Sequence, residues 1–312
     1  MYSIGIDIGG MSVKIGIVNE FGEMVEKTRV NSTVNFNESI NQTIETLKNL
    51  IISCNIDISK IKGIGIGCPG MVDSKNGIIK YLPNLNWENV PIKEMITKEI
   101  DLPIRISNDA NVAVLGEMKY GCCKNYSDIV MLTLGTGVGG GIIINRKLFE
   151  GGFSCGAELG HITLVVDGKE CACGRKGCFE KYASASALIE QTKAEMIKNK
   201  QSLLWEICDN NIDLIDGKSA FTCAKRKDET AMRIVDNFVK YLAEGIMSLL
   251  NIFRPEIVVI GGGISAEGDY LIDKIKKYCK KYNYGYQGVP VPKICVAMLK
   301  NDAGIIGASS LF

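Results

Sequence analysis

The sequence predicts an α/β protein built from two similar halves. Residues 4–19 and 130–145 can be laid over each other, and each is a β-rich run, a glycine turn and a second β-rich run. Amphipathic stretches with helical spacing follow each segment. With 312 residues, the chain also exceeds the length that one hydrophobic core usually serves. We therefore expect two domains facing each other across a cleft that binds a small ligand.

The elements of the first half follow from their apolar patterns. A hairpin over residues 4–19 is expected first, and Asn19 to Gly22 turns the chain into a third strand. Residues 38–53 have apolar side chains at helical spacing, with Asn37 as a possible N-cap. The predicted elements after the hairpin are a strand at 23–30, a helix at 38–53, and strands at 61–67 and 104–107.

The second half is predicted to be mostly helical after its own hairpin. Residues 183–245 have helical patterning with an interruption near 209–217. The later elements are a long helix at 231–253, a strand at 257–260, an amphipathic helix at 268–282 and a closing helix at 302–311. The expected domains are a small one, residues 1–108 plus 300–312, and a large one, residues 109–299.

Charge and composition exclude several classes of protein. The chain has 36 basic and 35 acidic residues, so it lacks the one-sided field that nucleic acid or an anionic membrane attracts. No apolar run approaches the roughly 18 residues of a membrane span, and no leader peptide is recognisable. Six of the 12 cysteines are scattered singly, as in a reduced protein: Cys54, Cys68, Cys208, Cys223, Cys279 and Cys295. We expect a cytoplasmic protein with a small neutral or anionic ligand.

The glycine turn of the first hairpin is a candidate phosphate site. It differs from the dinucleotide fingerprint, because that motif opens a helix and this turn continues as a strand. Glycines let backbone N–H groups approach phosphate oxygens, and Asp7 at the strand end can hold a water of hydrated Mg²⁺. The residues expected to contact a nucleotide here are Asp7, Gly9, Gly10, Ser12 and Lys14.

Two further glycine clusters favour a nucleotide. Residues 135–141 contain five glycines in seven positions, whereas a hairpin needs one or two. The surplus indicates bare backbone for a polyphosphate, with the Thr136 hydroxyl donating to an oxygen. A glycine triplet after the strand at 257–260 makes room for a purine and ribose, although helix packing explains it equally well. The residues concerned are Gly135, Thr136, Gly137, Gly261, Gly262 and Gly263.

Asn108 and Asp109, at the end of a predicted strand, are candidates for proton abstraction from a hydroxyl. Phosphoryl transfer passes through a loose transition state, so the base mainly orients the alcohol and receives its proton late. Asn108 can hold a neighbouring hydroxyl. The alternative is a purely structural N-cap of the next helix, made by Asn111 or Asp109, and both interpretations can hold together.

A zinc site is predicted from the one histidine of the chain and a group of cysteines. His161 precedes Cys171, Cys173 and Cys178, and this set matches a tetrahedral Cys₃His site. Four protein ligands leave no position for a catalytic water, so the zinc is expected to be structural. The alternative is a group of unrelated buried thiols. Zinc would also fix Glu158 and Glu180 near each other, where they suit a polyhydroxylated ligand.

Together these segments resemble the ROK family of sugar kinases and repressors, within the actin-like ATPase superfamily. The resemblance covers essentially the whole chain. It rests on the two phosphate turns, the Asn108-Asp109-Ala-Asn111 segment, Gly67-Cys-Pro-Gly70, Glu158-Leu-Gly-His161 and the cysteine segment that ends at Glu180. One departure is Met11, where the family has threonine. The implied fold is a duplicated actin-like ATPase (ribonuclease H-like) fold with two domains around a central cleft.

The resemblance also implies roles for individual residues. Asp109 is the implied general base toward the primary hydroxyl of a sugar. The other implied sugar ligands are Gly70, Asn84, Asn108, Glu158, His161 and Glu180. His161, Cys171, Cys173 and Cys178 are the implied zinc ligands, and the implied assembly is a homodimer.

The expected activity is transfer of the γ-phosphoryl group of MgATP to the 6-hydroxyl of a hexose. Glucose is the first candidate for this hexose. Fructose, N-acetylmannosamine, allose and β-glucosides remain alternative sugars, and other nucleotides or polyphosphate remain alternative donors. A sugar-sensing repressor is the competing class. Its DNA-binding segment would precede the first phosphate strand, which begins near residue 2, and the near-neutral charge also disfavours it.

Overall fold

The computed structural model describes residues 1–282, 284 and 290–312, and it contains two compact units. The first unit comprises residues 1–129, 141–157 and 298–312, and the second comprises 130–140 and 158–297. This division differs from the predicted boundary at residue 109. Helix α3 (Asp109–Lys119) packs against β4 (Ile61–Cys68) and α10 (Ala303–Ser309), so it belongs to the first unit.

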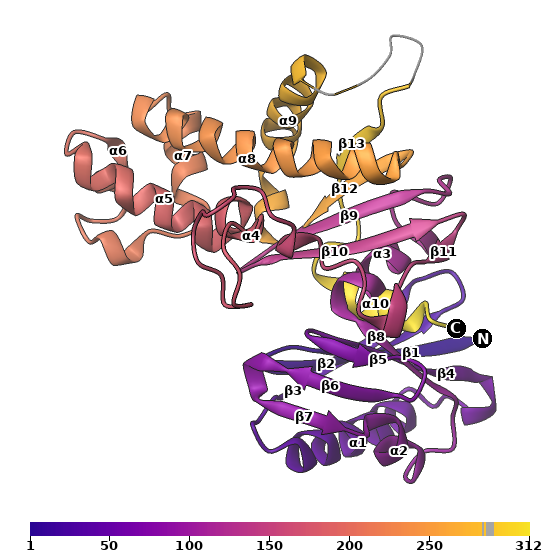
Figure 1. Cartoon of the computed structure of the whole chain (residues 1–312). Helices are drawn as coiled ribbons and strands as arrows, with labels where there is room; N and C mark the ends of the chain where they lie inside the picture. Colours follow the sequence, from indigo (N-terminus) through magenta and orange to yellow (C-terminus); the bar gives the residue numbers. More distant parts are fainter. Residues whose placement is uncertain (283, 285–289) are drawn as a thin grey trace. The chain divides into compact units, whose positions relative to one another are not determined.

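The first unit is organised around a five-stranded sheet with the order β3-β2-β1-β4-β8 (Figure 1). An antiparallel meander supplies three strands, and β4 and β8 extend it as parallel strands. The strands are β1 (Tyr2–Ile8), β2 (Ser12–Asn19), β3 (Met24–Asn31), β4 (Ile61–Cys68) and β8 (Ile104–Asn108). The predicted hairpin, third strand and two buried strands are confirmed.

A second five-stranded sheet repeats this order as β11-β10-β9-β12-β13. Its strands are β9 (Ile129–Leu134), β10 (Val138–Ile144), β11 (Lys147–Leu148), β12 (Ile257–Gly261) and β13 (Lys293–Val296). β12 and β13 are parallel, as β4 and β8 are in the first sheet. The duplication predicted from the repeated hairpins is therefore confirmed at the level of the sheets.

Helix α1 (Phe36–Ser53) covers the first sheet through a stripe that includes Ile44 and Leu47, both part of the core of the first unit. Asn35 is its N-cap, because its side chain accepts hydrogen bonds from the backbone N–H groups of residues 37 and 38. The predicted cap at Asn37 is therefore wrong. A short helix, α2 (Ile92–Thr97), and an antiparallel sheet complete this part of the unit; the sheet contains β5 (Met71–Asp73), β6 (Ile78–Leu82) and β7 (Trp87–Val90).

Helix α10 packs directly on the backbone of β1 and β4. A Cβ atom on Gly5 would lie 1.9 Å from the carbonyl oxygen of Ile305, and one on Gly65 would lie 1.8 Å from that of Ala308. Only glycine permits this approach. The glycines in these strands therefore let the C-terminal helix lie close to the sheet.

Helices make up most of the second unit. The longest is α8 (Glu229–Phe253), the long orange helix of Figure 1, which packs against α5, α7 and α9. Asp228 caps it by accepting a hydrogen bond from the backbone N–H of Ala231. The other helices are α4 (Glu180–Ala183), α5 (Ala185–Lys198), α6 (Leu203–Ile207), α7 (Ser219–Lys225) and α9 (Asp269–Tyr282).

Single turns of 3₁₀ helix lie in the connections at 58–60, 83–85, 152–154, 159–161, 212–214, 263–267 and 300–302. Among the described residues, none of the helices combines the length and apolarity that crossing a membrane requires.

Candidate functional site

Asp109 lies at the junction of β8 and α3, with its carboxylate on the surface of the first unit. Its Oδ1 atom accepts a hydrogen bond from the N–H of Ala110 at 2.8 Å. Asn108 is the N-cap of α3, since its Oδ1 accepts from the same N–H at 2.9 Å, so the predicted cap at Asn111 or Asp109 is wrong. Asn108 Nδ2 also donates to the carbonyl of Gly70 at 3.2 Å. Asp109 is exposed, so a ligand can reach its carboxylate.

Asp7, Cys68 and Asn108 lie at or next to the carboxyl ends of neighbouring parallel strands in the first sheet. Asp7 pairs with Gly67, and Cys68 pairs with Asn108. Burial raises the pKa of the Cys68 thiol, and the charges of Asp109 and Asp7 raise it further. Both carboxylates are thus close enough to influence this thiol. In open α/β sheets, ligands bind at the carboxyl ends of the strands, and these side chains lie there.

The first phosphate turn is held by backbone and ionic contacts. Gly9 donates its N–H to the carbonyl of Ser12 at 2.9 Å, and Lys14 Nζ lies 3.2 Å from Asp7 Oδ2. A Cβ on Gly10 would lie 3.1 Å from Cβ of Asn84, so the predicted sugar ligand Asn84 adjoins this turn. Met11, the departure from the family pattern, is 87% exposed, so its side chain is not part of the core.

The second phosphate turn has open backbone over only part of its length: at Gly141 a Cβ would lie 2.6 Å from a carbonyl oxygen of α3, so packing explains that glycine. A Cβ on Gly135 would meet no atom within 4 Å, so packing does not require glycine there. Thr136 is exposed. A Cβ on Gly137 would lie 2.5 Å from Glu180 Oε2, which places the Glu180 carboxylate against this turn.

The glycine triplet after β12 has two kinds of position. Gly262 has φ +78°, and a Cβ there would lie 2.4 Å from the carbonyl oxygen of Leu134, so packing and backbone conformation both require glycine. A Cβ on Gly261 would crowd Met131. A Cβ on Gly263 would meet no atom within 4 Å. Packing against β9, and not against a helix, therefore explains the first two glycines, whereas a side chain at Gly263 would meet open space.

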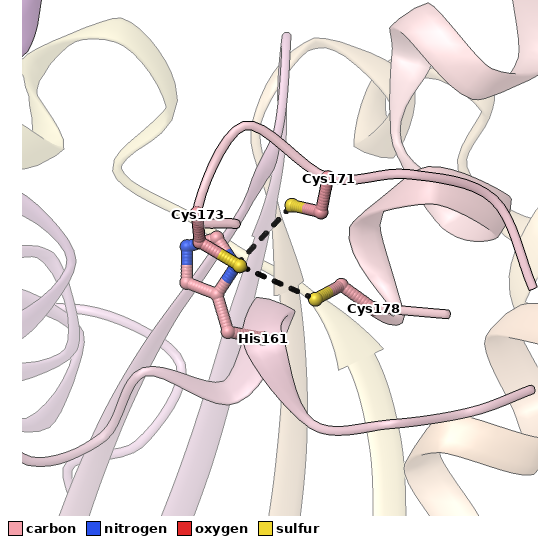
Figure 2. Close-up of side chains that lie close together, drawn as sticks. All are labelled: His161, Cys171, Cys173 and Cys178. Carbon is pink, nitrogen blue, oxygen red and sulfur yellow. Dashed lines mark hydrogen bonds between the residues drawn. The ribbon is translucent and has the colours of Figure 1, made fainter. Parts of the chain in front are cut away.

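Figure 2 shows the predicted zinc ligands gathered around one point, with dashed lines joining Cys171 to the His161 ring and Cys173 to Cys178. The ligand atoms of His161, Cys171, Cys173 and Cys178 all lie within 4.8 Å of one another. Cys173 Sγ is 3.6 Å from Cys178 Sγ, and Cys171 Sγ is 3.7 Å from His161 Nδ1. Sulfur ligands of a tetrahedral zinc are about 3.8 Å apart, so the four side chains fit such an ion.

Two glycines shape the loop that carries the cysteines. Gly174 and Gly177 have φ angles of +85° and +74°, and a Cβ on Gly177 would lie 1.6 Å from the carbonyl oxygen of Val165. Burial raises the pKa of Cys171 and Cys178, whereas a backbone hydrogen bond from Arg175 lowers that of Cys173. Zinc binding would therefore release protons from the two buried thiols.

Glu180 is in direct contact with this Cys₃His cluster. Its Oε1 accepts a hydrogen bond from Cys171 Sγ at 3.1 Å and lies 3.9 Å from His161 Nδ1. Glu158 keeps an exposed surface, but surrounding protein atoms desolvate its carboxyl group and raise its pKa. The His161 ring opposes this shift and the charge of Glu180 adds to it. The effect of the Glu180 charge on the pKa of Glu158 agrees with the predicted proximity of the two glutamates.

The candidate residues divide between the two units. The first unit contains the Asp7 turn, Gly70, Asn84, Asn108 and Asp109, and the second contains the Gly135 turn, Glu158, the Cys₃His cluster, Glu180 and Gly261–Gly263. Sequence reasoning missed Gly304, which packs on Asp7, and Glu150, which binds Ser107. A glycine inside the predicted closing helix was a signal for close packing at Gly304.

Comparison with known proteins decides the family. The model described as the ROK family matches residues 3–312. The chain belongs to the ROK family. The glucokinase of Streptomyces coelicolor is 35% identical over 311 residues, covering 99% of this chain and 96% of that protein. The xylose repressor of Caldicellulosiruptor bescii is 30% identical over 313 residues, covering 99% of this chain and 77% of that protein.

A solved structure supports the same conclusion about the fold. The ROK family glucokinase of Streptomyces griseus, solved in complex with glucose and AMPPNP, has a TM-score of 0.85 and 32% identity, covering 100% of this chain and 99% of that chain. The duplicated sheets of this ROK protein are thus those of the actin-like ATPase (ribonuclease H-like) fold. The family and fold expected from the motifs are confirmed.

Proposed function

We propose that this ROK-family protein is an ATP-dependent hexokinase, with glucose as its first candidate substrate. In the proposed reaction, the 6-hydroxyl of the sugar attacks the γ-phosphorus of MgATP, and Asp109 receives the proton of that hydroxyl. The observation that carries the proposal is the exposed Asp109 carboxylate beside Asn108, whose side chain is held by Gly70 and Ala110. A base in this position need only orient the alcohol and take its proton late.

Polar side chains and one backbone group are proposed to bind the sugar. Hydroxyl groups of a pyranose need several donors and acceptors, which carboxylates and amides supply. The fixed orientation of Asn108 and the contact of Glu180 with the Cys₃His cluster support these assignments. The proposed sugar ligands are Gly70, Asn84, Asn108, Glu158, His161 and Glu180.

The glycine turns are proposed to bind the triphosphate of MgATP. Bare backbone at Gly135 and the hydroxyl of Thr136 suit phosphate oxygens. Lys14 adds a positive charge beside Asp7, and Asp7 is proposed to face the hydrated magnesium ion that accompanies the nucleotide. The other proposed nucleotide contacts are Gly9, Gly10, Ser12, Gly137, Gly261, Gly262 and Gly263.

The proposed role of zinc is structural. His161, Cys171, Cys173 and Cys178 would fill all four positions of a tetrahedral ion, so no position is left for a reacting water. Bound zinc would cross-link the loop and hold Glu180 through the backbone, because Glu180 follows the ligand Cys178 by two residues. We further propose that the enzyme acts in the cytoplasm as a homodimer; the single, scattered cysteines of the sequence agree with a reducing compartment.

The test is a panel of sugars assayed by coupled detection of ADP. The panel contains glucose, fructose, N-acetylmannosamine, allose and a β-glucoside, with polyphosphate replacing ATP in parallel reactions. Asp109→Asn is expected to lower kcat by about 10³-fold with little change in sugar affinity, since general base catalysis contributes up to about 10⁴-fold. Full activity of Asp109→Asn would overturn the assignment. Sugar-dependent binding to DNA, with no turnover of any sugar, would indicate a repressor instead.

A further inference from the structure

The carboxylate of Glu150 connects two separate segments of the first unit. Ser107 Oγ donates to Glu150 Oε1 at 2.6 Å, and Ser74 Oγ donates to Glu150 Oε2 at 3.2 Å. Ser107 is 1% exposed, so its hydroxyl depends on a protein partner. Hydrogen bonds to an ionised carboxylate are stronger than those between neutral groups, and the 2.6 Å distance is typical of them.

Ser107 belongs to the segment that carries the proposed general base. It directly precedes Asn108 and Asp109, at the end of β8. Its hydroxyl oxygen also accepts from Asn111 Nδ2, in the first turn of α3, at a long 3.5 Å. A chain of contacts therefore runs from Glu150 through Ser107 into the helix that begins at Asp109.

Ser74 belongs to a neighbouring part of the proposed sugar site. It follows β5, and β5 begins directly after Gly70, whose carbonyl accepts from Asn108. Ser74 Oγ is also 2.7 Å from Ser154 Oγ, in the loop that Glu150 begins. The carboxylate and this serine thus hold the loop at two points.

The loop from Glu150 to Ala157 has a backbone that requires such anchors. Phe153, Ser154 and Ala157 have φ angles of +60°, +59° and +63°, in the left-handed region that side chains disfavour. Residues in this conformation persist where surrounding contacts hold them. The next residue in the chain is Glu158, a proposed sugar ligand.

We propose that Glu150 is a positioning residue for the sugar kinase reaction. Through Ser107 it orients the β8–α3 junction that carries Asp109, and through its own loop it sets the segment that leads into Glu158. Glu150 itself contacts no reacting group. This inference rests on the proposed function, because Asp109 and Glu158 take their roles from it.

The kinetic test compares Glu150→Ala with Glu150→Gln. Glu150→Ala is expected to lower kcat about 30-fold and to change the KM for ATP less than twofold, since small displacements of a reacting group cost up to about 100-fold. Glu150→Gln is expected to stay within about threefold of wild type, because its amide oxygen still accepts from Ser107. The kcat of Ser107→Ala should fall by the same factor as that of Glu150→Ala. The kcat of the double variant should fall no further.

The matched control is Ser202→Ala, which removes a similar serine–carboxylate contact in the second unit, 3.0 Å from Ser202 Oγ to Asp228 Oδ1. Its kcat should not change. Unchanged kcat in Glu150→Ala, or losses that add in the double variant, would overturn the proposal.

Hydrogen exchange of the full-length protein tests the same inference without turnover. In Glu150→Ala, backbone amides at 107–111 and 150–157 should exchange at least about threefold faster than in wild type or Ser202→Ala. Unchanged exchange at both segments would overturn the positioning role even if a sugar is phosphorylated. If wild type phosphorylates none of the sugars, the proposed function fails, and the exchange result alone decides whether Glu150 orders these segments.

Discussion

The α-carbon of Gly304 lies against the carboxylate of Asp7, so closely that a Cβ there would be 2.5 Å from Asp7 Cγ. Gly304 belongs to α10, and Asp7 is at the end of β1 beside the first phosphate turn. Lys14 contacts the same carboxylate at 3.2 Å. The position of Asp7 is therefore bounded by α10 and by Lys14.

The first prediction concerns Gly304→Ala. The added methyl group should displace Asp7 and lower kcat/KM for MgATP about tenfold, because a proposed magnesium contact is moved. The substitution should not lower helix stability, since alanine is preferred over glycine in a helix by about 1 kcal/mol. Coupled assays and thermal unfolding separate the two effects.

Gly217→Ala is the control for this prediction, because the nearest atom to its new Cβ is the flexible tip of Ile264 at 3.3 Å. Its kinetics should match wild type. Equal kcat/KM for Gly304→Ala and wild type would show that Asp7 tolerates displacement or does not contact the nucleotide.

The second prediction concerns removal of zinc. Exhaustive chelation, verified by metal analysis, should lower the unfolding temperature and raise the sugar KM about tenfold, because Glu180 loses its cross-linked support. Cys178→Ala should purify without tightly bound zinc. Cys223→Ala, which changes a fully buried cysteine outside the Cys₃His cluster, should retain it. An unchanged sugar KM in verified metal-free enzyme would contradict the coupling.

The third prediction concerns Glu117, which is fully buried and accepts hydrogen bonds from two backbone N–H groups. Its carboxylate accepts from the N–H of Cys122 at 2.9 Å and of Leu299 at 2.7 Å. In Glu117→Gln, the amide NH₂ would face one of these donors, so the free energy of unfolding should fall by about 2–4 kcal/mol. Urea titration measures this change.

The exposed pair of Glu94 and Lys98 provides the control for Glu117. Glu94→Gln should change the free energy of unfolding by less than about 0.5 kcal/mol, as exposed helical ion pairs contribute little. A similarly small change in Glu117→Gln would mean that its buried hydrogen bonds are dispensable.

The fourth prediction concerns alkaline pH. Burial raises the pKa of Tyr278 to about 12 from its ordinary value of 10.0, and its 2.8 Å hydrogen bond to Glu244 adds to the shift. Between these values the unfolded chain has lost a proton that the folded protein keeps. The stabilisation is therefore complete below about pH 10 and disappears as the pH approaches about 12.

The measurement compares wild type with Tyr278→Phe in urea titrations over this pH range. The difference in their free energies of unfolding should be constant near about pH 8 and shrink above about pH 10. A difference that stays constant up to about pH 12 would contradict the raised pKa.

Local patterns predicted those parts of the fold that repeat or alternate. The two hairpins and the buried strands have apolar residues at regular spacing, so the sequence alone reveals them. The cysteine spacing and its glycines likewise predicted the cluster around His161. The strands of the β5-β6-β7 sheet have three to five residues each, and their pairing depends on neighbours rather than on any period.

Tertiary contacts explain what local patterns missed. Glu150 and Ser107 are 43 residues apart, and Gly304 meets Asp7 from the other end of the chain. The choice of Asn108 over Asp109 as N-cap depends on the backbone angles of one residue, which neighbouring polar residues do not reveal. The division of the units near residue 130 likewise follows from the packing of α3 on α10.

The first unit includes the segment 298–312, and its helix α10 lies on Gly5 and Gly65. During protein synthesis, the last residue of the second unit is added before this segment. Until α10 is synthesised, one face of the first sheet stays uncovered. All residues of the second unit are present by then. A stop codon just before residue 298 would keep every residue of the second unit and leave the sheet that contains Gly5 and Gly65 exposed to aggregation.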